Sequence, residues 1–349
     1  MKIIGKMSKV FLEGVIILFL ATFLYFAFIP SALAVSLIPG DLIVADFNGY
    51  WDSATPPGSP QGRILKVDPA TGAQTMIASG GELNAPYDVG IDAWGNIIVV
   101  DAGGIGQIIR VNPADGTQTV ISEDNLFAGP LGMTMDASGK NIFVADATYN
   151  GTGGIIKIDL DTGNQTSYAT GGLIQRPSDV TIDDAGNLYM TSGLTGGWGV
   201  VKIAPDGIQT VHSFSTAPTW YTGIIFDDTS GNAYVNDLYY INGTRKVFPD
   251  GTQSILSSGS NFQDPYGLDF DLSGNIVVAD SNHFSGGKII GLDPSTGVQT
   301  LISSGGLLMD PAGIVVYSES VPEPATMLLL GTGLVCLAGF RRKFRKKVA

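Results

Sequence analysis

The stretch NIVVAD at 275–280 decides the fold, because close variants of it recur along the chain. The other copies are DLIVAD at 41–46, NIIVVD at 96–101, NIFVAD at 141–146, NLYMTS at 187–192 and NAYVND at 232–237. From the second copy onward they lie 43 to 46 residues apart, and the first interval is 55 because of an insertion at 47–62. A steady period of this length indicates a repeat architecture.

Each repeat contains four short runs rich in β-branched residues, separated by turn residues. Asp-x-x-Gly-Asn joins the first two runs, and a Pro- and Gly-containing turn joins the last two. The start of the fourth run is marked by Gln74, Gln118, Gln165, Gln209, Gln253 and Gln299. Four antiparallel strands in about 45 residues are typical of a propeller blade. We therefore predict an all-β, six-bladed β-propeller at 35–317, with no helix among the repeats.

The two ends of the repeat region predict how the ring closes. The first repeat begins at its second strand, 41–46, and the last segment, 311–317, is a first strand without partners of its own. Pairing these two segments completes one blade and leaves no open edge at the seam.

The run PYGLDFDLSGNIVVADSNH at 265–283 resembles an NHL repeat. The wider group includes the SMP-30/gluconolactonase type and the streptogramin-lyase-like propellers, and the resemblance covers about 275 residues. It implies the propeller fold strongly. It implies little about function, because this fold carries both binding proteins and enzymes.

Residues 1–34 have the pattern of a signal peptide. Three lysines precede an apolar run at 15–29, and Ala32-Leu33-Ala34 supplies a small-x-small site at which signal peptidase is expected to cut after Ala34. The alternative is an uncleaved membrane anchor. Either reading places the repeat region outside the cytoplasm.

The C-terminal region, 318–349, has three ordered parts. Pro322, Glu323 and Pro324 precede a 16-residue uncharged segment at 325–340, which six basic residues follow. This order resembles the PEP-CTERM sorting signal, and implies that an exosortase cuts near Pro322-Glu323-Pro324 after transient anchoring through a helical membrane segment. The protein is then expected to be secreted or held at the bacterial surface. A permanent anchor is the alternative.

The composition of the repeat region argues against several classes of partner and site. The region 35–317 has 10 basic and 29 acidic residues, a net charge of −19, so nucleic acid and anionic lipid are poor partners. We expect contact with the membrane only through the terminal segments. The single cysteine, Cys336, lies in the tail, which leaves no disulfide, thiolate metal site or cysteine nucleophile in the repeats.

The candidate site is the face where first strands begin and second strands end, because its loops differ most between repeats. Aromatic rings beside polar groups suit sugar or peptide recognition. Trp51 and Trp198 are expected in loops, where their loss would hardly affect stability. His283 is the histidine on this face, although Asn-His at this position is common in NHL repeats. The predicted ligand-binding residues are Tyr50, Trp51, Tyr149, Trp198, Trp220 and His283.

Two carboxylates occupy a position where other repeats have glycine. Asp88 and Asp179 are expected at the channel mouth, where they could hold Ca²⁺. The aspartate that ends most second strands recurs too often for a single catalytic centre, and is expected to cap a turn.

These observations favour an exported, non-catalytic module that binds extracellular glycan or protein. The alternative is a Ca²⁺-dependent hydrolase or lyase of the gluconolactonase or streptogramin-lyase type. Such a site needs a glutamate beside the aspartates, and no glutamate occupies an equivalent position. A structural matrix protein without a defined ligand is a third possibility.

Overall fold

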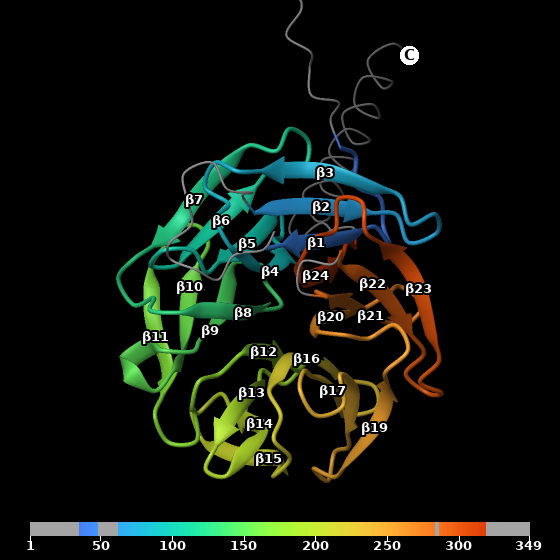
Figure 1. Ribbon diagram of the computed structural model, residues 1–349. Helices are drawn as coiled ribbons and strands as arrows, with labels where there is room; N and C mark the ends of the chain where they lie inside the picture. Colours follow the sequence, from blue (N-terminus) through green and yellow to red (C-terminus); the bar gives the residue numbers. More distant parts are fainter. Residues whose placement is uncertain (1–34, 48–61, 283–285, 319–349) are drawn as a thin grey trace, which may run out of the picture.

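A computed structural model describes residues 35–47, 62–282 and 286–318. Twenty-four strands in these residues form six four-stranded sheets, which surround a central channel as the blades of a propeller (Figure 1). The all-β, six-bladed prediction is confirmed. The described residues contain one helical turn, the 3-10 turn η1 (Tyr149–Gly151), and no helix long and apolar enough to span a bilayer. The predicted signal peptide and tail helix lie outside the described residues.

Blade 1 contains β24, β1, β2 and β3, and blades 2 to 6 each take the next four strands of the chain. The innermost strands are β24 (Pro311–Val316), β4 (Pro86–Ile91), β8 (Pro130–Met135), β12 (Asp179–Ile182), β16 (Tyr221–Asp227) and β20 (Pro265–Phe270). The second strands are β1 (Leu42–Asp46), β5 (Ile97–Asp101), β9 (Asn141–Asp146), β13 (Leu188–Leu194), β17 (Asn232–Asp237) and β21 (Ile276–Asp280).

The third and fourth strands complete each blade. The third strands are β2 (Arg63–Val67), β6 (Gln107–Val111), β10 (Gly154–Asp159), β14 (Gly197–Ile203), β18 (Gly243–Val247) and β22 (Lys288–Leu292). The outer strands are β3 (Gln74–Ser79), β7 (Gln118–Glu123), β11 (Gln165–Thr170), β15 (Gln209–Ser215), β19 (Gln253–Ser258) and β23 (Gln299–Ser304). All neighbouring strands within a blade pair antiparallel.

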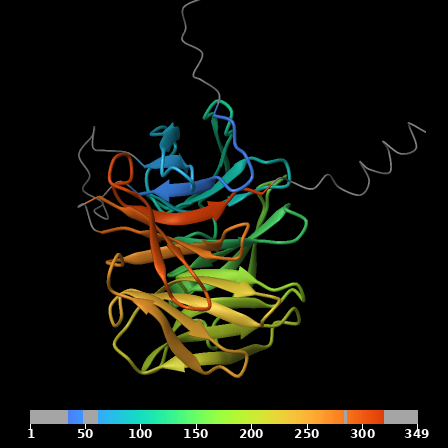
Figure 2. The ribbon, with the colours of Figure 1, turned by 90° about the vertical axis from the view of Figure 1, so that its right-hand side faces the viewer.

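The ring closes as predicted. β1 pairs antiparallel with β24, with Leu42 opposite Val316 and Val44 opposite Ile314. Figures 1 and 2 both show the blue strand β1 beside the orange-red strand β24. Gln74 strengthens the seam, because its amide nitrogen donates to the Ser303 hydroxyl and its amide oxygen accepts from the Leu307 N–H.

The core consists of apolar clusters between successive blades. One cluster joins blades 1 and 2 through side chains such as Ile43 and Val99, and another joins blades 6 and 1 through Leu42 and Val277. A second strand packs against a neighbouring blade on each of its two faces. Residues 97–101 are therefore buried at every position. The run is apolar from Ile97 to Val100, without the alternation of apolar and polar residues that a half-exposed strand shows.

Candidate functional site

The two faces of the propeller differ in which strand ends lie on them. Pro86, where β4 begins, lies opposite Asp101, where β5 ends, and β16 and β17 show the same pairing. The face where innermost strands begin and second strands end is called the start face. The opposite face, where innermost strands end and turn into second strands, is called the end face. The grouping of the variable loops on the start face follows the prediction.

The recurrent aspartate at the end of second strands holds the loops of the start face. Asp101 accepts hydrogen bonds from the N–H groups of Asn84 and Ala85 through one oxygen, and from Gly103 through the other. Asp146 repeats this arrangement in blade 3. The carboxylate therefore ties the loop that enters the blade to the loop that follows the second strand, as expected of a capping residue.

Asp88 and Asp179 lie within the channel wall, deeper than the predicted position at the mouth. One oxygen of Asp88 accepts from the N–H of Val89 in its own strand, and the other from Met133 in the next blade, at 2.7 Å. Asp179 links Val180 and Ile224 in the same way. A Cβ at Gly313 would come within 2.6 Å of the Asp88 Cα. Glycine is therefore required at this position of β24, which packs against the strand that carries Asp88.

Asp269 is a third channel carboxylate that the repeat comparison missed, since it stands two residues further along its strand. It bridges the N–H of Phe270 and that of Val316, and so links blades 6 and 1. An acidic residue between Leu268 and Phe270 in an innermost strand was the available signal. The three carboxylates span alternate blade boundaries: 2–3, 4–5 and 6–1.

Burial sets the protonation of these carboxylates. Desolvation, with a smaller contribution from the charge of Asp269, raises the pKa of Asp88 to about 7. Burial raises the pKa of Asp269 to about 6. Burial and the neighbouring Asp88 charge raise the pKa of Asp179 well above its ordinary value.

The channel carboxylates Asp88 and Asp179 border a small cavity. A cavity of about 10 Å³, close to the space one water molecule needs, lies between Asp88, Asp179, Tyr87 and Thr222. All four carboxylate oxygens already accept a backbone hydrogen bond. Ca²⁺ needs six to eight oxygen ligands, and within the described ranges no three His, Cys, Asp or Glu side chains gather as a metal site. Ca²⁺ binding here stays a prediction.

A row of aromatic rings crosses the start face at the boundary of blades 4 and 5. The centroids of Trp198 and Trp220 lie 6.2 Å apart, and those of Trp220 and Tyr239 lie 6.1 Å apart. The planes of successive rings are tilted by 35° and 45° relative to each other. We call Trp198, Trp220 and Tyr239 the aromatic row. The structure thus brings together two of the predicted residues and adds Tyr239, which is 62% exposed.

Two rings of the aromatic row are fixed by contacts with the blades. The Trp220 indole N–H donates to the Ser178 hydroxyl of blade 4 at 2.7 Å, which fixes the ring across the blade boundary. Trp198 is half-buried and lies in strand β14, opposite Gly193, where the prediction placed it in a loop. The β13–β14 hairpin is longer than its equivalents in other blades, and the extra residues continue the strand pairing.

A buried ion pair supports the turn that presents Tyr239. The Arg245 Nε donates to Asp237 at 2.6 Å, and the guanidinium lies between the rings of Tyr221 and Tyr240, within 6 Å of both centroids. Asp237 also accepts from the Thr219 hydroxyl and the Tyr240 N–H. Arg245 was not among the residues predicted from the sequence.

Two tyrosines meet in the channel near the start face. Tyr87 and Tyr266 meet edge to face with centroids 6.1 Å apart, and a second small cavity beside them is lined by Phe47, Ser281 and Asp310. Burial, followed by the charges of Asp310 and Asp264, raises the pKa of Tyr266, so the phenol stays protonated. Both tyrosines belong to an apolar cluster with Leu131 and Leu238, which brings together residues of four blades.

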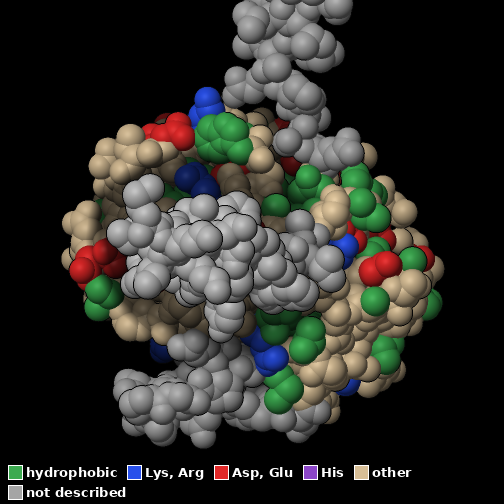
Figure 3. All heavy atoms as spheres, turned by 90° about the horizontal axis from the view of Figure 1, so that it is seen from above, with side chains coloured by type: hydrophobic (Ala, Val, Ile, Leu, Met, Phe, Trp, Pro, Cys, Tyr) green, Lys and Arg blue, Asp and Glu red, His purple; other side chains and the backbone are tan. Residues whose placement is uncertain are grey.

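The remaining predicted residues do not join the aromatic row. Tyr149 forms part of η1 and packs against the cluster between blades 2 and 3. Tyr50, Trp51 and His283 lie outside the described residues, as do Ala34, Pro322, Glu323 and Pro324. The side of the molecule that carries blade 1 shows acidic, basic and hydrophobic side chains intermingled (Figure 3).

Two comparisons with known proteins give matches. Residues 320–343 match the model of the PEP-CTERM protein-sorting motif, which implies an exported, cell-surface protein processed by an exosortase. No curated protein matches the chain.

Solved structures match at the level of fold. One is a chain from the crystal structure of a nidogen/laminin complex, at 16% identity and a TM-score of 0.63, covering 81% of this chain and all of that one. Another is TolB from Acinetobacter baumannii, at 14% identity and a TM-score of 0.58, covering 79% of this chain and 66% of that one. Neither comparison identifies the NHL subtype. The chain is therefore a six-bladed β-propeller that carries a PEP-CTERM sorting motif.

Proposed function

We propose that the protein is a non-catalytic binding module of the cell surface, and that its ligand is an extracellular glycan lying along the aromatic row. The observation that carries this proposal is the row itself: three successive rings about 6 Å apart, the middle one fixed by the hydrogen bond from Trp220 to Ser178. Flat rings cover the C–H faces of sugars, and rigid rings lose little entropy on binding. The net charge of −19 over 35–317 favours a neutral glycan over a polyanion.

The channel supports binding more than catalysis. Its carboxylates already accept hydrogen bonds from backbone N–H groups, and the cavity beside them has a volume of about 10 Å³, close to the space that one water molecule needs. A hydrolase needs a general acid or base within hydrogen-bond reach of its substrate. The enzyme alternative therefore has less support in the described residues than the binding alternative.

Binding is tested with the Tyr239→Ala variant. Tyr239 is exposed, so its loss should leave the melting temperature nearly unchanged and weaken glycan binding by about 1–3 kcal/mol. Trp198→Ala is less suitable, because this half-buried ring packs against the cluster between blades 4 and 5. The measurement is a glycan array containing neutral and acidic glycans, followed by titration calorimetry on any hit.

Ile105→Ala is the matched control, since Ile105 is 55% exposed on the same face in another blade. Unchanged binding by Tyr239→Ala would reject the aromatic row as the site. If the wild-type protein binds peptides and no glycan, a protein ligand replaces the glycan in the proposal.

A further inference from the structure

Both chain ends of the propeller lie side by side on the end face. The N–H of Gly40 donates to the Tyr317 carbonyl at 2.8 Å, and the N–H of Tyr317 donates to the Asp41 carbonyl at 2.8 Å. Lys66 fixes the N-terminal segment further, through the Ser36 carbonyl and the Asp41 carboxylate. The last described residue, Ser318, therefore leaves the domain from the end face, opposite the aromatic row.

Three large apolar side chains stay exposed around this exit. Ile38 is 60% exposed, Trp94 is 54% exposed and Leu272 is 61% exposed. They come from the N-terminal segment, the β4–β5 turn and the β20–β21 turn. A Cβ at Gly40 would lie 3.5 Å from Leu272, and one at Gly95 would lie 3.8 Å from the Tyr317 hydroxyl, so these segments are contiguous. We call Ile38, Trp94 and Leu272 the exit surface.

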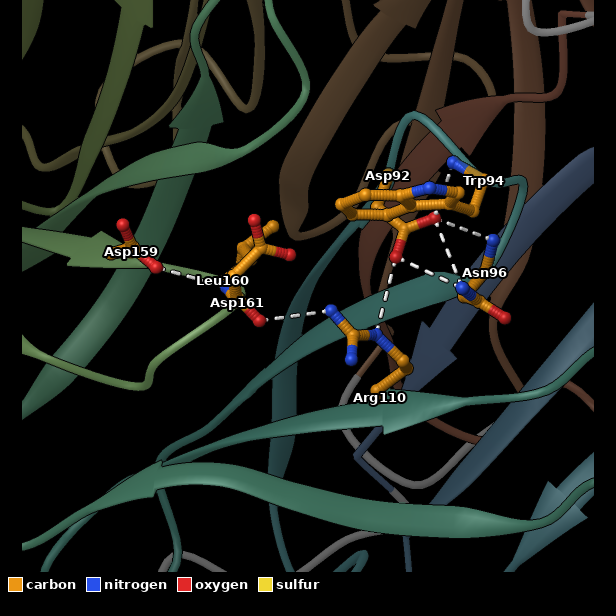
Figure 4. Close-up of polar contacts among 7 residues, drawn as sticks. All are labelled: Asp92, Trp94, Asn96, Arg110, Asp159, Leu160 and Asp161. Atoms are coloured by element: carbon orange, nitrogen blue, oxygen red, sulfur yellow. Dashed lines mark hydrogen bonds and ion pairs between the residues drawn. The ribbon is translucent and has the colours of Figure 1, made fainter.

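Trp94 is held in its exposed position (Figure 4). Its indole ring lies over the guanidinium of Arg110, 5.9 Å from Cζ to the ring centroid. Arg110 is itself fixed, because Nε donates to Asp92 at 3.2 Å and an η nitrogen donates to the Leu160 carbonyl at 3.0 Å. Asp92 also accepts from the Trp94 N–H. A rigid, exposed tryptophan is the kind of anchor that dominates protein interfaces.

The tether between the domain and the processing region is short. Three residues lie between Ser318 and Pro322, and the four Cα-to-Cα steps of a fully extended chain span at most roughly 14 Å. A domain of about 280 residues has a radius of gyration of roughly 19 Å. An enzyme that cuts near Pro322-Glu323-Pro324 therefore works within reach of the end face and against the exit surface.

We propose that the exit surface is a docking site for the exosortase that processes the tail. A lipid surface fits less well, because the neighbouring turns of the end face carry Asp68, Asp115 and Asp161, which anionic headgroups repel. Docking raises the effective concentration of the cleavage region at the enzyme, as in any tethered pair of contacts. This proposal is independent of the ligand on the start face.

The test uses the full-length chain in cells that contain its exosortase. The variant Ile38→Ser/Trp94→Ser/Leu272→Ser should slow processing about tenfold in a pulse–chase experiment, scored by mass spectrometry of peptides on both sides of Pro322–Pro324. The matched control, Ile105→Ser/Ile255→Ser/Leu301→Ser, removes three other exposed apolar side chains and should process at the parent rate. Parent-rate processing of the exit-surface variant, or equal slowing of the control, overturns the proposal.

A spacer separates docking from effects on folding or export. With about 20 Gly/Ser residues inserted after Ser318, the domain is no longer forced against the enzyme, so the variant and its spacer-bearing parent should process at equal rates. A deficit that persists with the spacer contradicts docking. If the triple variant melts at a lower temperature than the parent, the single variant Trp94→Ser replaces it in the test. We expect Trp94→Ser to slow processing about threefold, and unchanged processing would contradict the proposal.

Discussion

At the scale of single residues, the position of an aspartate in its blade decides what it does. At the end of a second strand, Asp101 collects three backbone N–H groups of two loops. In an innermost strand, Asp88 bridges two blades. At the end of β17, Asp237 pairs with Arg245 and supports the turn of Tyr239. Asp101 and Asp237 both end a second strand, and they differ in their partners. Asp101 accepts from backbone N–H groups, whereas Asp237 also pairs with Arg245.

Replacing Asp101 by alanine should destabilise the propeller by about 2–4 kcal/mol, because three N–H groups near a buried side chain lose their acceptor. Urea unfolding followed by circular dichroism gives the free energy of unfolding. Asp115→Ala is the control, since Asp115 is exposed and receives a backbone bond from Thr117 alone. Similar losses in both variants would argue against the loop-holding role.

At the scale of elements, the repeat predicted most of the strands. Buried second strands such as 97–101 are apolar at nearly every residue, and the Asp-x-x-Gly-Asn turns fix where they begin. The position of Trp198 was not predictable in the same way. Whether residues after Ser192 form a loop or extend the hairpin depends on pairing with β14 and β15, which the local sequence does not specify.

The candidate site was predicted only in part, for a related reason. Aromatic residues mark the start face, yet their side chains point where blade packing allows. Tyr87 and Tyr266 meet in the channel cluster, Tyr149 packs against the cluster between blades 2 and 3, and Trp220 is held to blade 4 by its bond to Ser178. Contacts between blades are set by residues some 40 positions apart, so a single repeat does not reveal them.

Strand β24 should be essential to the whole domain, although it contributes only six residues. A chain ending at Asp310 lacks the innermost strand of blade 1, exposes β1 and the cluster between blades 6 and 1, and loses the bond between Asp269 and Val316. A chain ending at Ser318 keeps all of these. We expect a large drop in melting temperature for the first truncation and none for the second. Equal melting of both chains would contradict closure through β24.

At the scale of the whole molecule, the two proposed sites lie on opposite faces of the propeller. The aromatic row lies on the start face, and the chain ends lie on the end face beside the exit surface. A ligand can therefore be held while the tail is still attached, because neither site covers the other. Insertions on the start face lie away from the exit of the tail, and loop closure makes such insertions inexpensive.

The channel couples the stability of the ring to pH. Burial raises the pKa of Asp88 to about 7 and that of Asp269 to about 6, against roughly 3.9 for an aspartate in an unfolded chain. Between about pH 4 and pH 7 the folded protein therefore holds more protons than the unfolded chain. The stabilisation from these groups is complete below pH 4 and is lost as the pH rises through 6 and 7. Asp179 and Asp280 act in the same direction.

Urea unfolding between pH 4 and pH 8 should consequently show a free energy of unfolding that decreases as the pH rises. Asp269→Asn should be less stable at low pH, because an amide N–H₂ then meets a backbone N–H, and its pH slope between 4 and 7 should be shallower. Asp293→Asn is the control, because Asp293 affects the pH dependence of stability in the opposite direction. Hydrogen bonds from Ser295 and Thr296 lower the pKa of the exposed Asp293 to about 2, so its stabilisation is lost only as the pH falls below about 4. An Asp269→Asn protein that keeps the full slope between pH 4 and pH 7 would show that the channel carboxylates do not set the pH response of the ring.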